Sequence, residues 1–197
     1  IEKIKGVQRD YSFIVSGKKT TFWGRPEAGG DIWSAVFNQL REAGDLNDES
    51  DVLTIGPRFD LEIHFFRDTL GLKNTIGLDL RSDDESLIRV GDMHCMPFED
   101  SSFDMIYQKN TFNKSYDIRK ALEECVRVLR PGGILVSDEC LDYVDGVSEI
   151  ARTNIVSNEW YLACLRNNVD EVIFNKEWTA SASFIRKSGG IALKIKK

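Results

Sequence analysis

Small and acidic residues lie where short apolar runs end, and their spacing is suited to holding a nucleoside. Gly56 closes the run DVLTIG, and Asp79 lies near the end of the next strand-like run, NTIGLDL. A carboxylate about 20 residues after a first-strand glycine can accept hydrogen bonds from both hydroxyls of a ribose. An acid at such a position can also cap a helix or be solvated in a loop. The pair favours a nucleoside ligand.

A second acid, Asp92, opens the loop after the third strand-like run, in the segment GDMHCMPFEDSSFD. Its carboxylate could accept a hydrogen bond from the exocyclic amine of a purine, and Met93 and Met96 could give the ring soft apolar contact. Alternatively, Asp92 is a turn residue after Gly91. His94 is a candidate general base, because histidine is the side chain type suited to proton transfer near neutral pH, and its alternative role is packing against the sheet.

These residues need elements that bring them together. From 51 to 139, short apolar runs alternate with amphipathic stretches, which predicts successive βα units. The expected α/β fold has a mostly parallel sheet with helices on both faces, and ligands bind at the carboxyl ends of its strands. The clearest helix covers about 115–129, where the segment RPGG is expected to end it.

Further elements flank this region. A helix is predicted behind Asp31, a candidate N-cap, and should stop near Gly44. Another helix is expected over about 147–166. The two β-rich runs that follow are separated by a short polar stretch at about 188–190, so they should pair antiparallel. The first thirty residues are expected to be an irregular or hairpin-like segment.

Composition narrows the class of protein. The 197 residues carry 26 Lys and Arg against 32 Asp and Glu, a net charge of −6, which argues against nucleic-acid binding. No apolar run approaches the roughly 18 residues of a membrane helix, so no membrane partner is expected. Four cysteines without a CxxC pair, and two histidines, favour free thiols in the cytoplasm and no metal site.

The chain is expected to form a single globular domain. Residues 1–50 are predicted to be an N-terminal arm and helix, and residues 51–197 the core domain. Because the chain begins at Ile1 rather than Met, the sequence leaves open whether an additional domain lies upstream. A partner protein stays open as well, since Trp33 and Phe37 could face either the core or another subunit.

The segments GDMHCMPFEDSSFDMIY and ALEECVRVLRPGGILVSDE resemble the class I S-adenosylmethionine-dependent methyltransferases. The resemblance covers about 51–139 and implies a three-layer sandwich around a seven-stranded, mostly parallel, Rossmann-like sheet with one antiparallel strand. It implies S-adenosyl-L-methionine as the cofactor. By resemblance, Asp79 would bind the ribose hydroxyls and Asp92 the adenine amine, with Met93 beside the ring. Gln108 and the two residues after it would lie near the methionine part.

One motif departs from that family. Its first turn is typically glycine-rich, whereas this chain has TIGPRFD, in which Gly56 remains and Pro57, Arg58 and Phe59 follow. Pro57 removes a backbone donor, and the two larger side chains fill space. Arg58 could replace the lost contacts by pairing with the carboxylate of the cofactor. Alternatively, the site has lost its ligand.

Two functions therefore compete. The first is a methyltransferase acting on a small-molecule acceptor, at oxygen, nitrogen or carbon. The second is a catalytically inactive, methyltransferase-like domain that serves as a scaffold or binds a partner. A nicotinamide-dependent oxidoreductase fits less well, because no G-x-G-x-x-G follows the first strand. Trp23 and Arg25 could form a lid over the cofactor or anchor the N-terminal segment.

Overall fold

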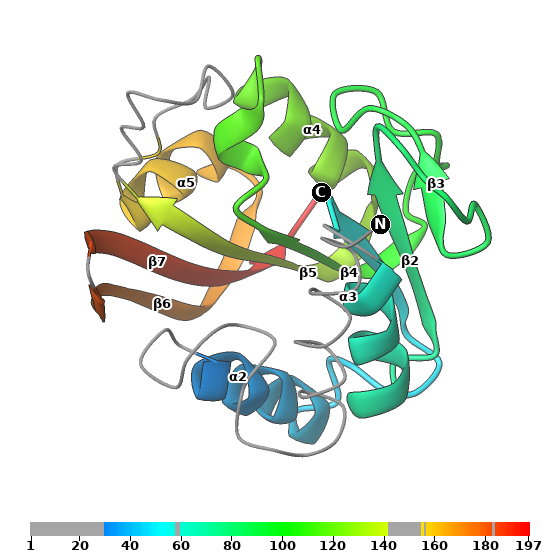
Figure 1. Ribbon diagram of the computed structural model, residues 1–197, viewed down its shortest axis with the longest axis horizontal. Helices are drawn as coiled ribbons and strands as arrows, with labels where there is room; N and C mark the ends of the chain where they lie inside the picture. Colours follow the sequence, from blue (N-terminus) through cyan, green and yellow to red (C-terminus); the bar gives the residue numbers. More distant parts are fainter. Residues whose placement is uncertain (1–29, 58–59, 142–154, 156, 183) are drawn as a thin grey trace.

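The structure is a computed structural model that describes residues 30–57, 60–141, 155, 157–182 and 184–197 (Figure 1). Expectations for the first twenty-nine residues, which include Trp23 and Arg25, and for Arg58 and Phe59, lie outside these described residues. None of the described helices is long and apolar enough to cross a membrane.

A seven-stranded sheet with the order β3-β2-β1-β4-β5-β7-β6 organises the chain. The strands are β1 (Asp51–Ile55), β2 (Asn74–Asp79), β3 (Ile88–Val90), β4 (Phe103–Lys109), β5 (Leu129–Leu141), β6 (Val169–Ala182) and β7 (Phe184–Ile195). Only β7 runs against its neighbours, and it pairs antiparallel with both β5 and β6. The predicted mostly parallel sheet with one antiparallel strand is confirmed.

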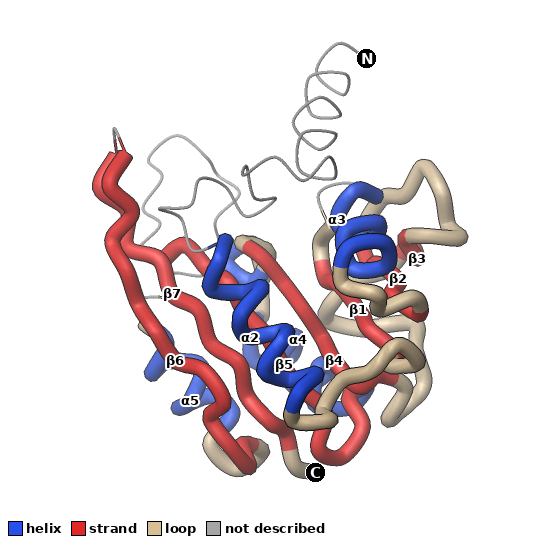
Figure 2. Tube along the Cα trace, turned by 90° about the horizontal axis from the view of Figure 1, so that it is seen from below, coloured by secondary structure: helices blue, strands red, loops and turns tan. Residues whose placement is uncertain are grey.

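Helices cover both faces of the sheet (Figures 1 and 2). They are α2 (Gly30–Glu42), α3 (Asp60–His64), the π-helical turn η2 (Phe65–Thr69), the 3-10 turn η3 (Phe112–Lys114), α4 (Ile118–Val128) and α5 (Asn158–Leu165). The α2 and η2 segments share one apolar cluster, and α4 and α5 share the other, across the sheet. Because both faces are covered, the middle of β4 is buried on each side, and the predicted three-layer sandwich is confirmed.

Two helix boundaries differ from expectation. The helix α2 begins at Gly30, so Asp31 lies inside its first turn instead of at the N-cap; Gly44 follows its end with a φ of +81°. The helix α5 begins only at Asn158, because Ser157 is extended, whereas the sequence predicted a start near 147. The segment 142–154 is not described.

The two other differences concern glycines. The helix α4 ends at Val128, close to the predicted end near 129, but RPGG belongs to β5, because Leu129 already pairs with Phe103 in the sheet. The β6 and β7 strands meet between Ala182 and Phe184, so the stretch expected to separate them lies inside β7. A Cβ at Gly190 would lie 2.7 Å from the Trp33 ring, so close packing against α2 explains the glycine there.

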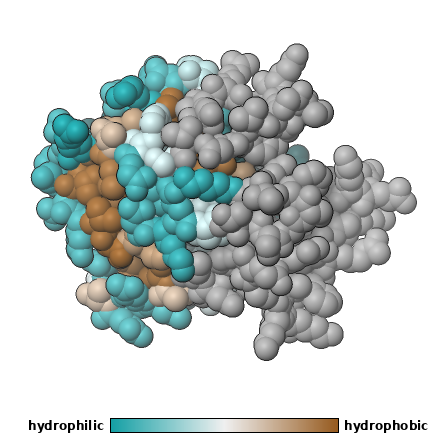
Figure 3. Space-filling model, turned by 90° about the vertical axis from the view of Figure 1, so that its left-hand side faces the viewer, coloured by the Kyte–Doolittle hydropathy of each residue, from teal (hydrophilic) through white to brown (hydrophobic). Residues whose placement is uncertain are grey.

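The strand β6 forms one edge of the sheet, on the side shown in Figure 3, where hydrophobic and hydrophilic residues are mixed. Charged side chains such as Glu171 and Lys176 are exposed along it. Exposed charges discourage pairing of an edge strand with another chain. All four cysteines lie among the described residues, and none of them forms a disulfide.

Candidate active site

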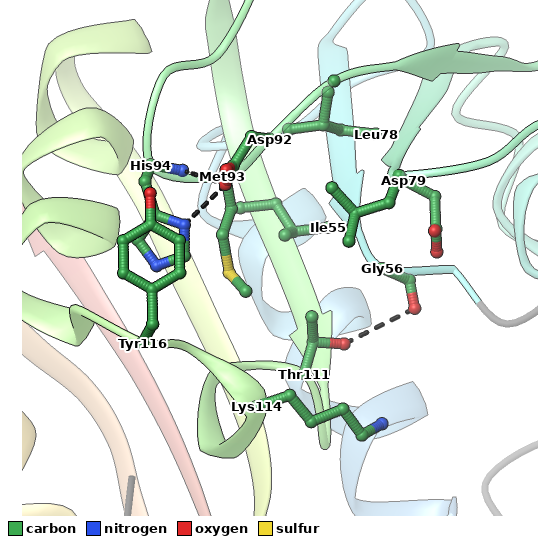
Figure 4. A pocket seen from close by; sticks show the side chains of 12 residues that line it. Ile55, Gly56, Leu78, Asp79, Asp92, Met93, His94, Thr111, Lys114 and Tyr116 are labelled. Carbon is green, nitrogen blue, oxygen red and sulfur yellow. Dashed lines mark hydrogen bonds and ion pairs between the residues drawn. The ribbon is translucent and has the colours of Figure 1, made fainter. Parts of the chain in front are cut away.

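A cavity of about 220 Å³ opens at the carboxyl ends of the parallel strands (Figure 4). Ends of strands β1 and β2, the loop after β3 and the turn after β4 surround it. Its twelve lining residues are Ile55, Gly56, Leu78, Asp79, Leu80, Gly91, Asp92, Met93, His94, Thr111, Lys114 and Tyr116. The structure thus brings together five residues that the sequence selected, Gly56, Asp79, Asp92, Met93 and His94.

Asp79 ends β2 with its carboxylate largely unpaired. Its backbone carbonyl accepts a hydrogen bond from Gly91 (2.9 Å), which ties the end of β2 to the turn after β3. In the described part of the chain, the Asp79 carboxylate accepts only one hydrogen bond, from the Arg81 amide at 3.3 Å. Because an ionised carboxylate can accept about four hydrogen bonds, this side chain retains capacity for a ligand.

Asp92 is held by its neighbour. The Asp92 carboxylate accepts a hydrogen bond from the His94 amide (2.9 Å) and pairs with Nδ1 of the His94 ring at 2.5 Å. Burial alone would raise the pKa of the Asp92 carboxyl, but the hydrogen bonds from His94 outweigh it and hold this pKa below its ordinary value. Asp92 is therefore a fixed, ionised acceptor at the cavity.

His94 is a buried structural link. Its side chain is 3% exposed, its Nε2 lies 2.6 Å from the Ser115 hydroxyl, and its ring stacks on Tyr116 with centroids 3.7 Å apart. With both ring nitrogens engaged, the geometry favours packing and orientation of Asp92 over proton transfer to a substrate. Neither Ser115 nor Tyr116 was selected from the sequence, which shows no motif around them.

The loop that carries Asp92 is also tied to α4. Arg127 donates hydrogen bonds to the carbonyls of Met96 (3.0 Å) and Phe98 (2.8 Å), and Glu124 accepts one from the Met96 amide at 2.7 Å. The hydrogen bond from Arg127 lowers the pKa of Glu124. The segment RVLRPGG thus anchors the loop that carries Asp92.

The first turn takes its course from Gly56. This residue has a φ of +65°, and a Cβ there would overlap the Thr111 side chain. The Thr111 hydroxyl lies 3.4 Å from the Gly56 carbonyl and 3.2 Å from that of Lys109. Next to it, Pro57 packs against β2, where a Cβ at Gly77 would lie 2.8 Å from the proline ring. Thr111 is a lining residue that sequence reasoning missed.

Gln108 lies behind the cavity and is not among its lining residues. It is fully buried, and its Oε1 accepts hydrogen bonds from the amides of Thr111 (2.9 Å) and Phe112 (3.3 Å). Its Nε2 donates to the Ser137 hydroxyl and to Glu139 (3.2 Å). In this arrangement Gln108 fixes the turn that carries Thr111.

Two buried carboxyls lie near the same ends of the strands. Burial raises the pKa of Glu139 to about 8, although the hydrogen bond from Gln108 opposes this rise. Burial also raises the pKa of Glu62 on α3 to about 8, against the attraction of Lys109. Within the described residues, Oε1 of each has no hydrogen-bond partner. The charge of Asp138 also raises the pKa of Glu62. Because successive residues of a strand face opposite sides of the sheet, Asp138 and Glu139 lie on different faces.

The chemistry of the lining fits the adenosine part of S-adenosylmethionine. Two carboxylates supply acceptors for hydroxyl and amino hydrogens, and apolar side chains supply a surface for a ring. Among the latter, Leu80 is 71% exposed. No group of three or more metal-ligating side chains occurs among the described residues.

Comparison with known proteins agrees with this geometry. Residues 71–137 match a family model described as a methyltransferase domain. The malonyl-[acyl-carrier protein] O-methyltransferase 1 of Coxiella burnetii is 43% identical over 51 residues, which are 26% of this chain and 18% of that protein. The chain thus spans less than a fifth of the length of this curated relative.

Solved structures share the fold at low sequence identity. A SAM-dependent methyltransferase from Methanosarcina mazei superposes with a TM-score of 0.58 at 17% identity, covering 80% of this chain and 98% of its own. The phosphoethanolamine N-methyltransferase 2 of Haemonchus contortus, in complex with phosphomonomethylethanolamine and S-adenosylhomocysteine, gives 0.62 at 13% identity, covering 84% and 53%. Residues 71–137 are thus similar to a methyltransferase domain, and the whole described sheet shares its fold with solved methyltransferases.

Proposed function

We propose that the protein transfers a methyl group from S-adenosylmethionine to an oxygen, nitrogen or carbon atom of a small-molecule acceptor. One observation carries the proposal: Asp79 and Asp92, on neighbouring strand ends, line one cavity with an apolar surface beside them. In this role Asp79 binds the ribose hydroxyls, Asp92 binds the adenine amine, and Met93 lies against the ring. Gly56 lets the chain pass close to Thr111.

When bound, the cofactor supplies an electrophilic methyl group on a sulfonium. The residues of this chain then have to align the acceptor with that group and exclude water. A side chain that accepts a proton is not required for every acceptor, so the engagement of both His94 nitrogens is compatible with the reaction. His94 acts here by orienting Asp92.

Acceptor and location are part of this proposal. The Coxiella burnetii relative is, by its name, a malonyl-[acyl-carrier protein] O-methyltransferase, which makes acceptors with a free carboxylate the first class to assay. Four free thiols fit the cytoplasm, because thiols stay reduced there.

Isothermal titration with S-adenosylhomocysteine and S-adenosylmethionine tests the ribose contact. In Asp79→Asn, the loss of a charged acceptor should lower the affinity for both ligands about 10- to 100-fold, as expected for hydrogen bonds to a charged group. Asp83→Asn, which changes an exposed acid in the next loop, should leave affinity unchanged. Equal affinity of wild type and Asp79→Asn would contradict the assigned contact.

The second candidate is the inactive scaffold. Pro57 favours it, because a proline after Gly56 leaves the turn with one donor fewer for a ligand. A ligand that binds the native state must stabilise it. Absence of any rise in melting temperature with millimolar S-adenosylhomocysteine would therefore favour the scaffold over the methyltransferase.

A further inference from the structure

The turn after β1 has few donors for the carboxylate of the cofactor, so another residue has to bind it. This inference rests on the proposed function. The methionine part of the cofactor ends in a carboxylate, which needs hydrogen-bond donors or a cation when it leaves water. Pro57 has no backbone N–H, and its ring is packed against β2 at Gly77. The start of this turn therefore offers an anion fewer donors than a glycine turn would.

Lys114 is the cationic side chain among the described residues that line the cavity. It ends η3, the short turn that follows β4, and its side chain is exposed. In Figure 4 its ammonium lies toward Gly56 and Thr111, whereas Asp92 and His94 lie across the cavity. Within the described part of the chain, this ammonium forms no hydrogen bond or ion pair, so it is available to an anion.

The backbone of η3 is firmly placed, so the position of Lys114 is not arbitrary. The Lys114 amide donates to the Thr111 carbonyl at 3.0 Å, and the two preceding residues, Phe112 and Asn113, are buried. Gln108 in turn holds the Thr111 and Phe112 amides. The attraction of Lys114 also opposes the rise in the pKa of Glu139, so the ammonium acts on the strand ends.

We propose that Lys114 binds the carboxylate of the methionine part of the cofactor and replaces the donors that the Pro57 turn lacks. With the adenine at Asp92 and the ribose at Asp79, the rest of the molecule would extend past Gly56 toward Thr111 and Lys114, which Figure 4 shows beyond Asp79. Charge agrees with this assignment, because Lys114 would attract the carboxylate, whereas Asp92, across the cavity, would repel it. A lysine ammonium is a compact cation that pairs well with a carboxylate at a partly wet site.

Two ligands separate this contact from the adenosine contacts. S-adenosylhomocysteine carries the amino-acid carboxylate, and 5′-methylthioadenosine has the same nucleoside and thioether without it. Isothermal titration of the whole chain should show that Lys114→Met weakens S-adenosylhomocysteine about 10-fold, the value of one charge-assisted hydrogen bond. Affinity for 5′-methylthioadenosine should change less than about twofold. Lys114→Arg should keep most of the affinity for S-adenosylhomocysteine.

Lys120→Met is the matched control, because Lys120 is exposed on α4 and does not line the cavity. It should leave both affinities unchanged, and the melting temperature of Lys114→Met should equal that of wild type. Equal losses of both ligands in Lys114→Met would overturn the proposal, and so would no loss of either. If Arg58→Met alone weakened only S-adenosylhomocysteine, the carboxylate would belong to Arg58.

The proposed function is tested separately, by measuring whether the wild-type protein binds the two ligands. Wild type that binds both ligands supports an adenosine site, whatever Lys114→Met does. Wild type that binds neither ligand overturns the adenosine site and the role of Lys114 together.

Discussion

Polar residues near the strand ends have opposite roles at the cavity and behind it. On the side of β2 and β3, Asp79 and Asp92 are partly exposed and keep acceptor positions open to a ligand. On the side of β4 and β5, Gln108 and Glu139 are buried and hydrogen-bonded to each other. Residues that look equivalent along the sequence therefore differ in role, and burial decides which role each has.

The carboxyls of the two regions also differ in charge. Hydrogen bonds from His94 hold the pKa of Asp92 below its ordinary value, so this acid stays charged at the cavity. Burial instead raises the pKa of Glu139 to about 8, so this acid is largely neutral at neutral pH. A charged carboxylate at the cavity is suited to accept hydrogen bonds from a ligand, whereas a neutral, hydrogen-bonded carboxyl supports the turn beside it.

The largest expected effect comes from Gln108→Met. This change keeps the length of the side chain but leaves the amides of Thr111 and Phe112 without their side-chain acceptor and removes one of the hydrogen bonds to Glu139. Unpaired buried groups each cost about 1–3 kcal/mol, so the free energy of unfolding should fall by about 3 kcal/mol. Urea denaturation followed by circular dichroism measures it.

Gln39→Met provides the control, because Gln39 is exposed on α2. It should change the free energy of unfolding by less than about 0.5 kcal/mol. A loss of less than about 1 kcal/mol in Gln108→Met would remove the proposed division between a supporting side and a binding side.

A smaller, pH-dependent effect is expected from Glu139→Gln. The pKa of Glu139 is raised from 4.5 to about 8 in the folded chain, so the native state holds a proton that the unfolded state has lost. The stability from this proton is complete below pH 4.5 and disappears as the pH rises through about 8. Glu139→Gln does not titrate and should be more stable than wild type at pH 9, with a difference that grows as the pH rises from 5.

The measurement is urea denaturation at pH 5, 7 and 9. Wild type and Glu139→Gln should be similar at pH 5 and diverge as the pH rises. Glu62, whose pKa is also about 8, should leave part of the pH dependence in the variant. Glu123→Gln on the exposed face of α4 should follow wild type at every pH. Parallel curves for wild type and Glu139→Gln would mean that Glu139 is charged in the native state.

The sequence predicted the fold, and the convergence of three strand-end residues on one cavity, for one physical reason. Carboxyl ends of parallel strands meet at one edge of a sheet, so Gly56, Asp79 and Asp92 had to converge once the strands were identified. The antiparallel pairing of β6 and β7 followed from the short distance between two β-rich runs.

The other side could not be predicted because its contacts join residues far apart in sequence. Nothing local to Thr111 shows that it packs on Gly56, and nothing local to Ser115 shows that it bonds to His94. Gln108 was expected near the cofactor because it ends a strand. Its side chain instead bonds to Ser137 and Glu139 on the neighbouring β5, which only the register of the two strands reveals.

The smallest effect separates binding from stability on the ligand-facing side. Asp79→Asn should strongly lower the affinity for the cofactor. Without ligand, it should change the free energy of unfolding by less than about 0.5 kcal/mol. The reason is that the Asp79 side chain accepts a single long hydrogen bond of 3.3 Å, from Arg81, in the described residues, and an asparagine oxygen can accept it as well. Urea denaturation of the ligand-free variant measures this. A loss above about 1 kcal/mol would make Asp79 a supporting residue like Gln108, and weaker cofactor binding in the variant would then no longer identify a ribose contact.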